Sequence, residues 1–158
     1  RQPILAGSFM SENYMSAGNN WNIDSLFNAL KALDEVASQE ITLSLIQSSE
    51  PSIKLEMNDF GGLPIHIALA GQQIIVDTVL VDIDSITDVR AFNDAVLRSR
   101  EMFPLSSIGI ESMPNGQTVY NMFGALSADS SLTNVVTEVK TLVDNVQRAS
   151  EAFEHFFK

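Results

Sequence analysis

The feature that most constrains this chain is its last stretch, residues 130–157, where apolar side chains recur every three or four positions over about four heptads. This spacing predicts a long amphipathic helix, with Asp129 and Ser130 suited to capping its start. A coiled coil normally carries complementary charges beside its seam, but only Glu138 is charged at those positions. We therefore expect the helix to pack on a sheet or helix layer of its own domain. The stripe consists of Leu132, Val135, Val139, Leu142, Val146, Ala149, Phe153 and Phe156, widened by Val136, Val143 and Phe157.

The end of this helix carries a cluster of three phenylalanines, Phe153, Phe156 and Phe157. A helix of about 28 residues is about 42 Å long, whereas strands of five to eight residues span only about 17–27 Å. We expect the helix to extend beyond its own sheet, so that the phenylalanines need another surface. The sequence therefore predicts a protein interface at this end, formed in a homo-oligomer, most simply a dimer, or with a different partner.

Upstream of the last helix, the chain alternates between helical and strand-like patterns. Residues 23–37 are predicted to form a first helix, capped by Asn22 or Asp24, with Trp21 packing from just outside it. A middle helix is expected near residues 87–102. Short turns between alternating runs indicate antiparallel strands. The expected strands cover residues 41–45, 53–57, 65–69, 74–81, 108–110 and 119–123.

This order of elements, α-β-β-β-β-α-β-β-α, predicts an α+β fold in which the long C-terminal helix packs on an antiparallel β-sheet. Residues 1–20 lack periodicity and end in a polar run, so they are interpreted as an N-terminal extension or irregular arm. Residues 21–158 are then expected to form a single domain.

Composition narrows the possible functions. Twenty acidic residues against nine basic ones give a formal net charge of -11, which opposes binding to nucleic acid and to anionic membrane surfaces. There are no cysteines, so disulfides, thiolate nucleophiles and cysteine-ligated metals are excluded. No apolar run approaches the 18 to 20 or so residues needed to span a bilayer, and no membrane insertion is expected. These properties favour a cytoplasmic location.

Residues that could carry chemistry are few. His66 lies in an alternating strand and His155 on the polar side of the last helix, and no G-x-S-x-G motif accompanies them. Asp82-x-Asp84 lacks the central glycine and closing glutamate of a calcium loop, and no phosphate-binding glycine loop is present. We predict no catalytic residues, no metal and no cofactor. The alternative that stays open is a small-ligand or metal sensor, or a minor hydrolase, using His66 and nearby carboxylates.

Three short segments resemble a known bacterial family: Trp21-Asn22-Ile23, Leu63-Pro64-Ile65-His66-Ile67-Ala68 and Met102-Phe103-Pro104-Leu105-Ser106. They are similar to the YjfI family of uncharacterised bacterial proteins, over about residues 20–158. The order of elements is also similar to that of type III secretion chaperones and their YbjN-like relatives. Those chaperones usually have three strands before the middle helix, whereas four are expected here.

The resemblance implies a non-enzymatic role in protein binding. It also implies a link to relatives of PspA, a coiled-coil protein of the envelope-stress response. The function predicted from the sequence is therefore a cytoplasmic protein-binding or adaptor module, with a PspA-like coiled-coil protein as the implied partner.

Overall fold

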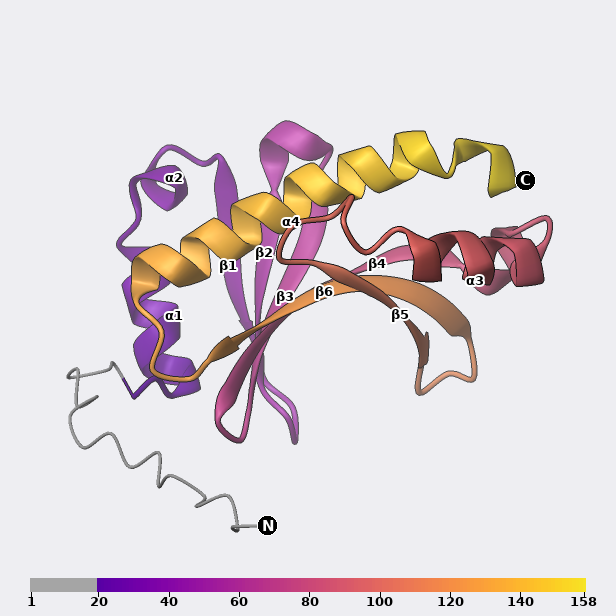
Figure 1. Ribbon diagram of the computed structural model, residues 1–158. Helices are drawn as coiled ribbons and strands as arrows, with labels where there is room; N and C mark the ends of the chain where they lie inside the picture. Colours follow the sequence, from indigo (N-terminus) through magenta and orange to yellow (C-terminus); the bar gives the residue numbers. More distant parts are fainter. Residues whose placement is uncertain (1–19) are drawn as a thin grey trace, which may run out of the picture.

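Six antiparallel strands form one twisted sheet, and the helices of residues 20–158 lie against it (Figure 1). The structure is a computed structural model that describes residues 20–158, so nearly all of the expected N-terminal extension lies outside the described residues. The strand order β1-β2-β3-β4-β6-β5 leaves β1 and β5 at the edges. The strands are β1 (Ile41–Ile46), β2 (Ser52–Met57), β3 (Leu63–Ala70), β4 (Gln73–Asp82), β5 (Ser107–Ser112) and β6 (Thr118–Ser127). The α-helices are α1 (Ile23–Lys31), α2 (Asp34–Ala37), α3 (Val89–Arg98) and α4 (Leu132–Ala152). Three 3-10 turns complete the described elements: η1 (Asn58–Phe60), η2 (Ile83–Ser85) and η3 (Glu154–Phe156).

The α+β class and the order of elements predicted from the sequence are confirmed, including four strands before the middle helix. The predicted extent of the first helix is wrong, because α1 ends at Lys31 and α2 begins at Asp34. Leu33, between them, has an extended backbone with ψ 145° and occupies the N-cap position of α2 without a side-chain hydrogen bond. Asn22 caps α1 as expected: the backbone N–H of Ser25 donates to its side chain at 2.8 Å, and its own backbone N–H donates to the Ser25 hydroxyl at 3.0 Å.

The alternating strand patterns place their apolar side chains on one face of the sheet. Ile53 pairs with Ile67 and Leu55 with Ile65 in the β2–β3 ladder, and all four are fully buried. The predicted tight turn between β3 and β4 is present, since Gly71 adopts the positive φ of 62° that the two-residue connection needs. The buried face of the sheet is the floor of the core.

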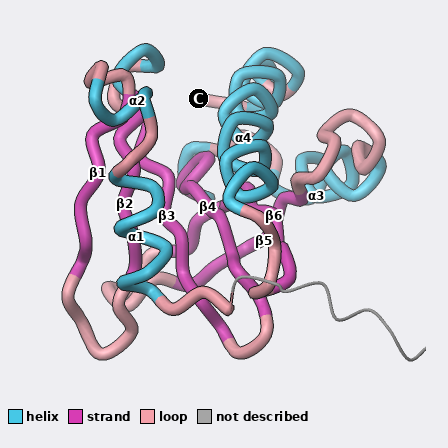
Figure 2. Tube along the Cα trace, turned by 90° about the vertical axis from the view of Figure 1, so that its left-hand side faces the viewer, coloured by secondary structure: helices cyan, strands magenta, loops and turns pink. Residues whose placement is uncertain are grey.

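Helix α4 lies across this apolar face, as its stripe predicts, and contacts β4 and β6 (Figure 1). Ser131, rather than Asp129 or Ser130, caps it, and its hydroxyl accepts from the backbone N–H of Asn134 at 3.1 Å. Figure 2 shows α4 between α2 on one side and α3 on the other. Among residues 20–158, none of the helices has the length and apolar character that crossing a membrane requires.

Candidate functional site

The three C-terminal phenylalanines pack on α3 of their own chain. Helix α4 ends at Ala152, and the single 3-10 turn η3 follows it, so the α-helix does not continue to residue 157. Phe153 is only 4% exposed, and its ring centroid lies 5.3 Å from that of Phe92 on α3. Phe156 lies at the same distance from Phe92, and Phe157 lies 6.4 Å away. The expectation that these rings find no cover within their own domain is therefore wrong, while their contact with another chain stays a prediction.

The residues after α4 also hold the segment that leads into α3. Phe157 forms an antiparallel bridge with Ile86. The backbone N–H of Thr87 donates to Phe156 O at 2.8 Å, and the N–H of Lys158 donates to Ser85 O at 2.9 Å. We call residues 153–158 the C-terminal strap. It fixes the start of α3 relative to α4, and so positions one wall of the surface described next.

Helix α3 is shorter than the sequence pattern suggests. Asp88 caps it, accepting from the backbone N–H of Ala91 at 3.0 Å, and Ser99 ends it, with its hydroxyl donating to Val96 O at 2.7 Å. Phe92 is fully buried and points to the core. The helix thus ends before residue 102, the end that the sequence predicts, and Pro104 lies in the loop that joins α3 to β5.

An apolar groove runs between α3 and the edge strand β5. It consists of two adjoining hollows that share Val96, Leu97 and Ile108, the larger with a volume of about 290 Å³. Ile108 and Ile110 pair with Met122 and Tyr120 of β6, so they point to the same face of the sheet as the core. We call this surface the α3–β5 groove. Its lining residues are Asn93, Val96, Leu97, Ser99, Arg100, Phe103, Ser106, Ser107, Ile108, Gly109, Ile110 and Tyr120.

Exposed large apolar side chains concentrate at this groove and in the adjoining loop that joins α3 to β5. Of seven in residues 20–158, four fall between positions 97 and 110, and Leu97 is 81% exposed. The sequence pattern did not identify these residues, because Leu97 and Met102 fall within the predicted helix of residues 87–102 and Ile110 falls within a predicted strand. The sequence feature that could have identified Met102 and Leu105 is the apolar run of residues 102–105, which lies in the loop between α3 and β5. The four residues are Leu97, Met102, Leu105 and Ile110.

His66 lies on the opposite, outward face of the sheet. It pairs across the strands with Lys54 on one side and Asp77 on the other. Burial raises the pKa of the Asp77 carboxyl, while the charge of His66 acts in the opposite direction. No group of three histidines or carboxylates in residues 20–158 could hold a metal ion. His155, the second histidine, lies in the C-terminal strap far along the chain from this row.

Two polar side chains of α4 that lie beside the apolar stripe are buried. Asn145 is 1% exposed, and its amide donates to Pro104 O at 2.7 Å and to the Ser106 hydroxyl at 2.9 Å. Glu138 is 5% exposed and its carboxyl lies over Gly124 of β6. Burial raises the pKa of Glu138. The two hydrogen bonds of Asn145 fix the α3–β5 loop against α4.

Residues 20–157 match the family of uncharacterized proteins conserved in bacteria, DUF2170, and the chain belongs to this family. It is 37% identical over 136 residues to the uncharacterized protein YjfI of Escherichia coli K12, covering 86% of this chain and 97% of the relative. The YjfI protein of E. coli O157:H7 matches to the same extent. The resemblance inferred from three short segments is confirmed.

Two solved structures share the fold at low sequence identity. YbjN from E. coli superposes with a TM-score of 0.59 at 12% identity, covering 85% of this chain and 96% of YbjN. A chain of the HopA1–SchA chaperone–effector complex superposes with a TM-score of 0.54 at 11% identity, covering 83% and 98%. The chain therefore has a YbjN-like fold that is also found in a chaperone–effector complex.

Proposed function

We propose that this chain is a non-enzymatic protein-binding module that docks a partner in the α3–β5 groove. The observation that carries the proposal is the concentration of exposed apolar side chains there, with Leu97 81% exposed beside Ile110 at 56%. Clustered apolar surface on a soluble fold is typical of a contact site, whereas single exposed residues are ordinary. The fold shared with a chaperone–effector complex supports a role in binding polypeptides.

The partner that we propose is a PspA-type coiled-coil protein, as the sequence resemblance implies. A helix with apolar residues every three or four positions can lay that stripe into a groove of this kind. The groove lies between a helix and an edge strand, so both walls are regular elements that keep their shape. A cytoplasmic location, which the composition favours, is part of this proposal, and a link to envelope stress would follow from the partner.

Capture of purified PspA from the same organism, measured by biolayer interferometry, tests the proposal. Leu97→Asp combined with Ile110→Asp should abolish binding, because two buried charges would face the apolar stripe of the partner. Ile46→Asp is the matched control, since Ile46 is 37% exposed on the opposite edge strand, β1. Retention of binding by the double variant, or absence of binding by the natural protein, would contradict the proposal.

A further inference from the structure

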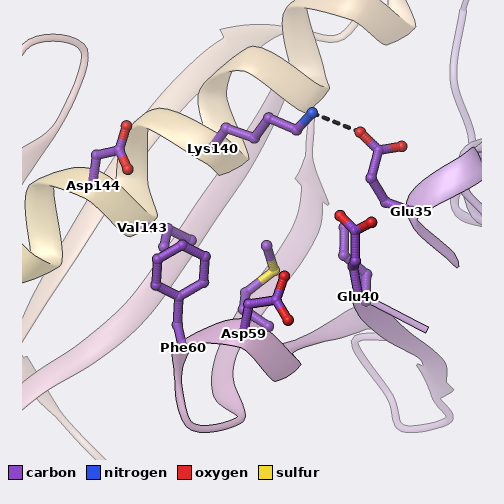
Figure 3. Close-up of a pocket in the computed structure, with 9 residues that line it drawn as sticks. Glu35, Glu40, Asp59, Phe60, Lys140, Val143 and Asp144 are labelled. Carbon is purple, nitrogen blue, oxygen red and sulfur yellow. Dashed lines mark hydrogen bonds and ion pairs between the residues drawn. The ribbon is translucent and has the colours of Figure 1, made fainter. Parts of the chain in front are cut away.

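A second hollow lies on the other side of α4 from the α3–β5 groove, between α4, α2 and the turn η1 (Figure 3). Its volume is about 250 Å³. The apolar part of its lining comes from Ile41, Met57 and Val143, which are 5%, 6% and 2% exposed. Phe60 forms one wall, with its ring directed toward Val143 and 40% of its surface exposed (Figure 3). We call this hollow the acidic pocket.

Four carboxylates and a single ammonium group surround this apolar lining. Lys140 forms an ion pair with Glu35, since its Nζ donates to Glu35 Oε1 at 2.6 Å. This hydrogen bond lowers the pKa of Glu35. Glu40, Asp59 and Asp144 have no basic partner among residues 20–158. Figure 3 shows Glu40 and Asp59 directed upward from the β1 and η1 side toward α4. The pocket therefore combines an apolar floor with uncompensated negative charge.

We propose that the acidic pocket receives a lysine or arginine side chain of a partner protein. Such a side chain has an apolar stem that suits Met57 and Val143, and a cationic head that suits the three carboxylates without a basic partner among residues 20–158. The Phe60 ring adds a face on which a cation is attracted. A volume of about 250 Å³ accommodates one long side chain and lies below the roughly 300–1,000 Å³ of typical small-molecule sites.

The proposal rests on the proposed function in one respect, the existence of a protein partner, and it adds a local property of that partner. The partner must present a basic residue on a segment that reaches α4 from the α2 side. Against a chain with a formal net charge of -11, such a residue also gains from long-range attraction. The acidic pocket would then select among partners that offer a similar apolar stripe to the α3–β5 groove.

Titration of the ¹⁵N-labelled protein with blocked tripeptides tests the pocket without knowledge of the partner. Acetyl-Ala-Lys-Ala-amide should shift the amide signals of the residues that line the pocket, and these shifts should weaken as sodium chloride is added. The norleucine peptide keeps the stem but lacks the ammonium group, so it should bind more weakly. Equal binding of the two peptides, or no shift at these residues with the lysine peptide, would overturn the proposal.

Variants that remove carboxylate charges show which carboxylates bind the lysine peptide. Asp59→Asn together with Asp144→Asn should weaken binding of the lysine peptide by about two- to fivefold for each carboxylate, the range expected of exposed ion pairs. Glu151→Gln, an exposed carboxylate on the same helix α4 but outside the pocket, is the matched control and should bind as the natural protein does. Undiminished binding by the double variant would refute the assignment. Tighter binding of 1,5-diaminopentane than of the peptide would refute it as well, in favour of a free diamine.

These results separate the two proposals. Leu97→Asp should leave the peptide titration unchanged, since Leu97 lies on α3, across α4 from the pocket. If PspA capture depends on Leu97 while the lysine peptide fails to bind, the proposed function stands and the acidic pocket assignment falls. If the peptide binds but no PspA is captured, the acidic pocket assignment stands and the proposed function falls.

Discussion

The contact between Glu138 and Gly124 makes a quantitative prediction. A Cβ atom added at Gly124 would lie 1.7 Å from Glu138 Oε1, 2.8 Å from its Cδ and 3.0 Å from the carbonyl oxygen of Leu105. Ordinary heavy-atom contacts begin at about 3.5 Å, so Gly124→Ala must displace the Glu138 carboxyl from its site. Overpacking of this kind lowers the free energy of unfolding by about 1–3 kcal/mol. For a domain of this size, each kcal/mol lowers Tm by about 2–4 °C.

A double-mutant cycle attributes the loss to this contact. Glu138→Ala removes the clashing carboxyl and leaves only the Leu105 carbonyl near the new methyl group. Gly124→Ala should therefore cost at least about 1 kcal/mol less in the Glu138→Ala background than in the natural protein, as measured by urea unfolding followed by circular dichroism. Gly109→Ala, on β5, is a control and should cost the same in both backgrounds. If the cost of Gly124→Ala agrees within about 0.5 kcal/mol between the backgrounds, the reasoning is refuted.

The remaining predictions concern the pH dependence of stability and self-association. Burial raises the folded-state pKa of Glu138, so the stability that its protonated form contributes is full below the ordinary pKa and is lost as the pH rises through the folded pKa. The free energy of unfolding of Glu138→Gln, relative to that of the natural protein, should therefore increase from pH 4 to pH 7. A difference that stays constant over this range would contradict the prediction. We propose that Phe156 and Phe157, half-buried beside the core residue Phe153, contribute to a homodimer. Phe156→Glu with Phe157→Glu should then reduce the mass seen by light scattering from twice 17.3 kDa to the chain mass, and an unchanged mass in a folded variant would disprove it.

The sequence predicted the parts of the fold that depend on periodicity. The stripe of α4 and the alternation of the strands identify the buried face because an apolar side chain is stabilised by leaving water wherever it lies on that face. Helix ends were less accurate. The extended backbone of Leu33 and the early end of α3 at Ser99 are set by packing with other elements, which a local pattern does not contain.

Burial of Glu138 and Asn145 could not be predicted, because a polar residue beside an apolar seam ordinarily faces solvent. The relevant signal is far along the chain: Gly124 leaves space for the Glu138 carboxyl, and the loop after α3 supplies the Pro104 carbonyl for Asn145. The acidic pocket was missed for a similar reason. Its carboxylates come from α2, the turn before β1, η1 and α4, and only the tertiary fold brings them together.

The C-terminal strap has a consequence for the order of local unfolding. Its bridge joins Phe157 to Ile86, which is 71 positions earlier in the chain, and Lys158 Nζ donates to Asp84 O at 2.7 Å. The segment that leads into α3 is thus held by the last residues of the chain, in addition to the cap that Asp88 provides. Transient release of the strap would free α3 as a cooperative unit while the sheet stayed folded. In a hydrogen-exchange experiment, the amides of Thr87 and α3 should then exchange together. The rigidity of one wall of the α3–β5 groove would thus depend on residues of the strap, which do not line the groove.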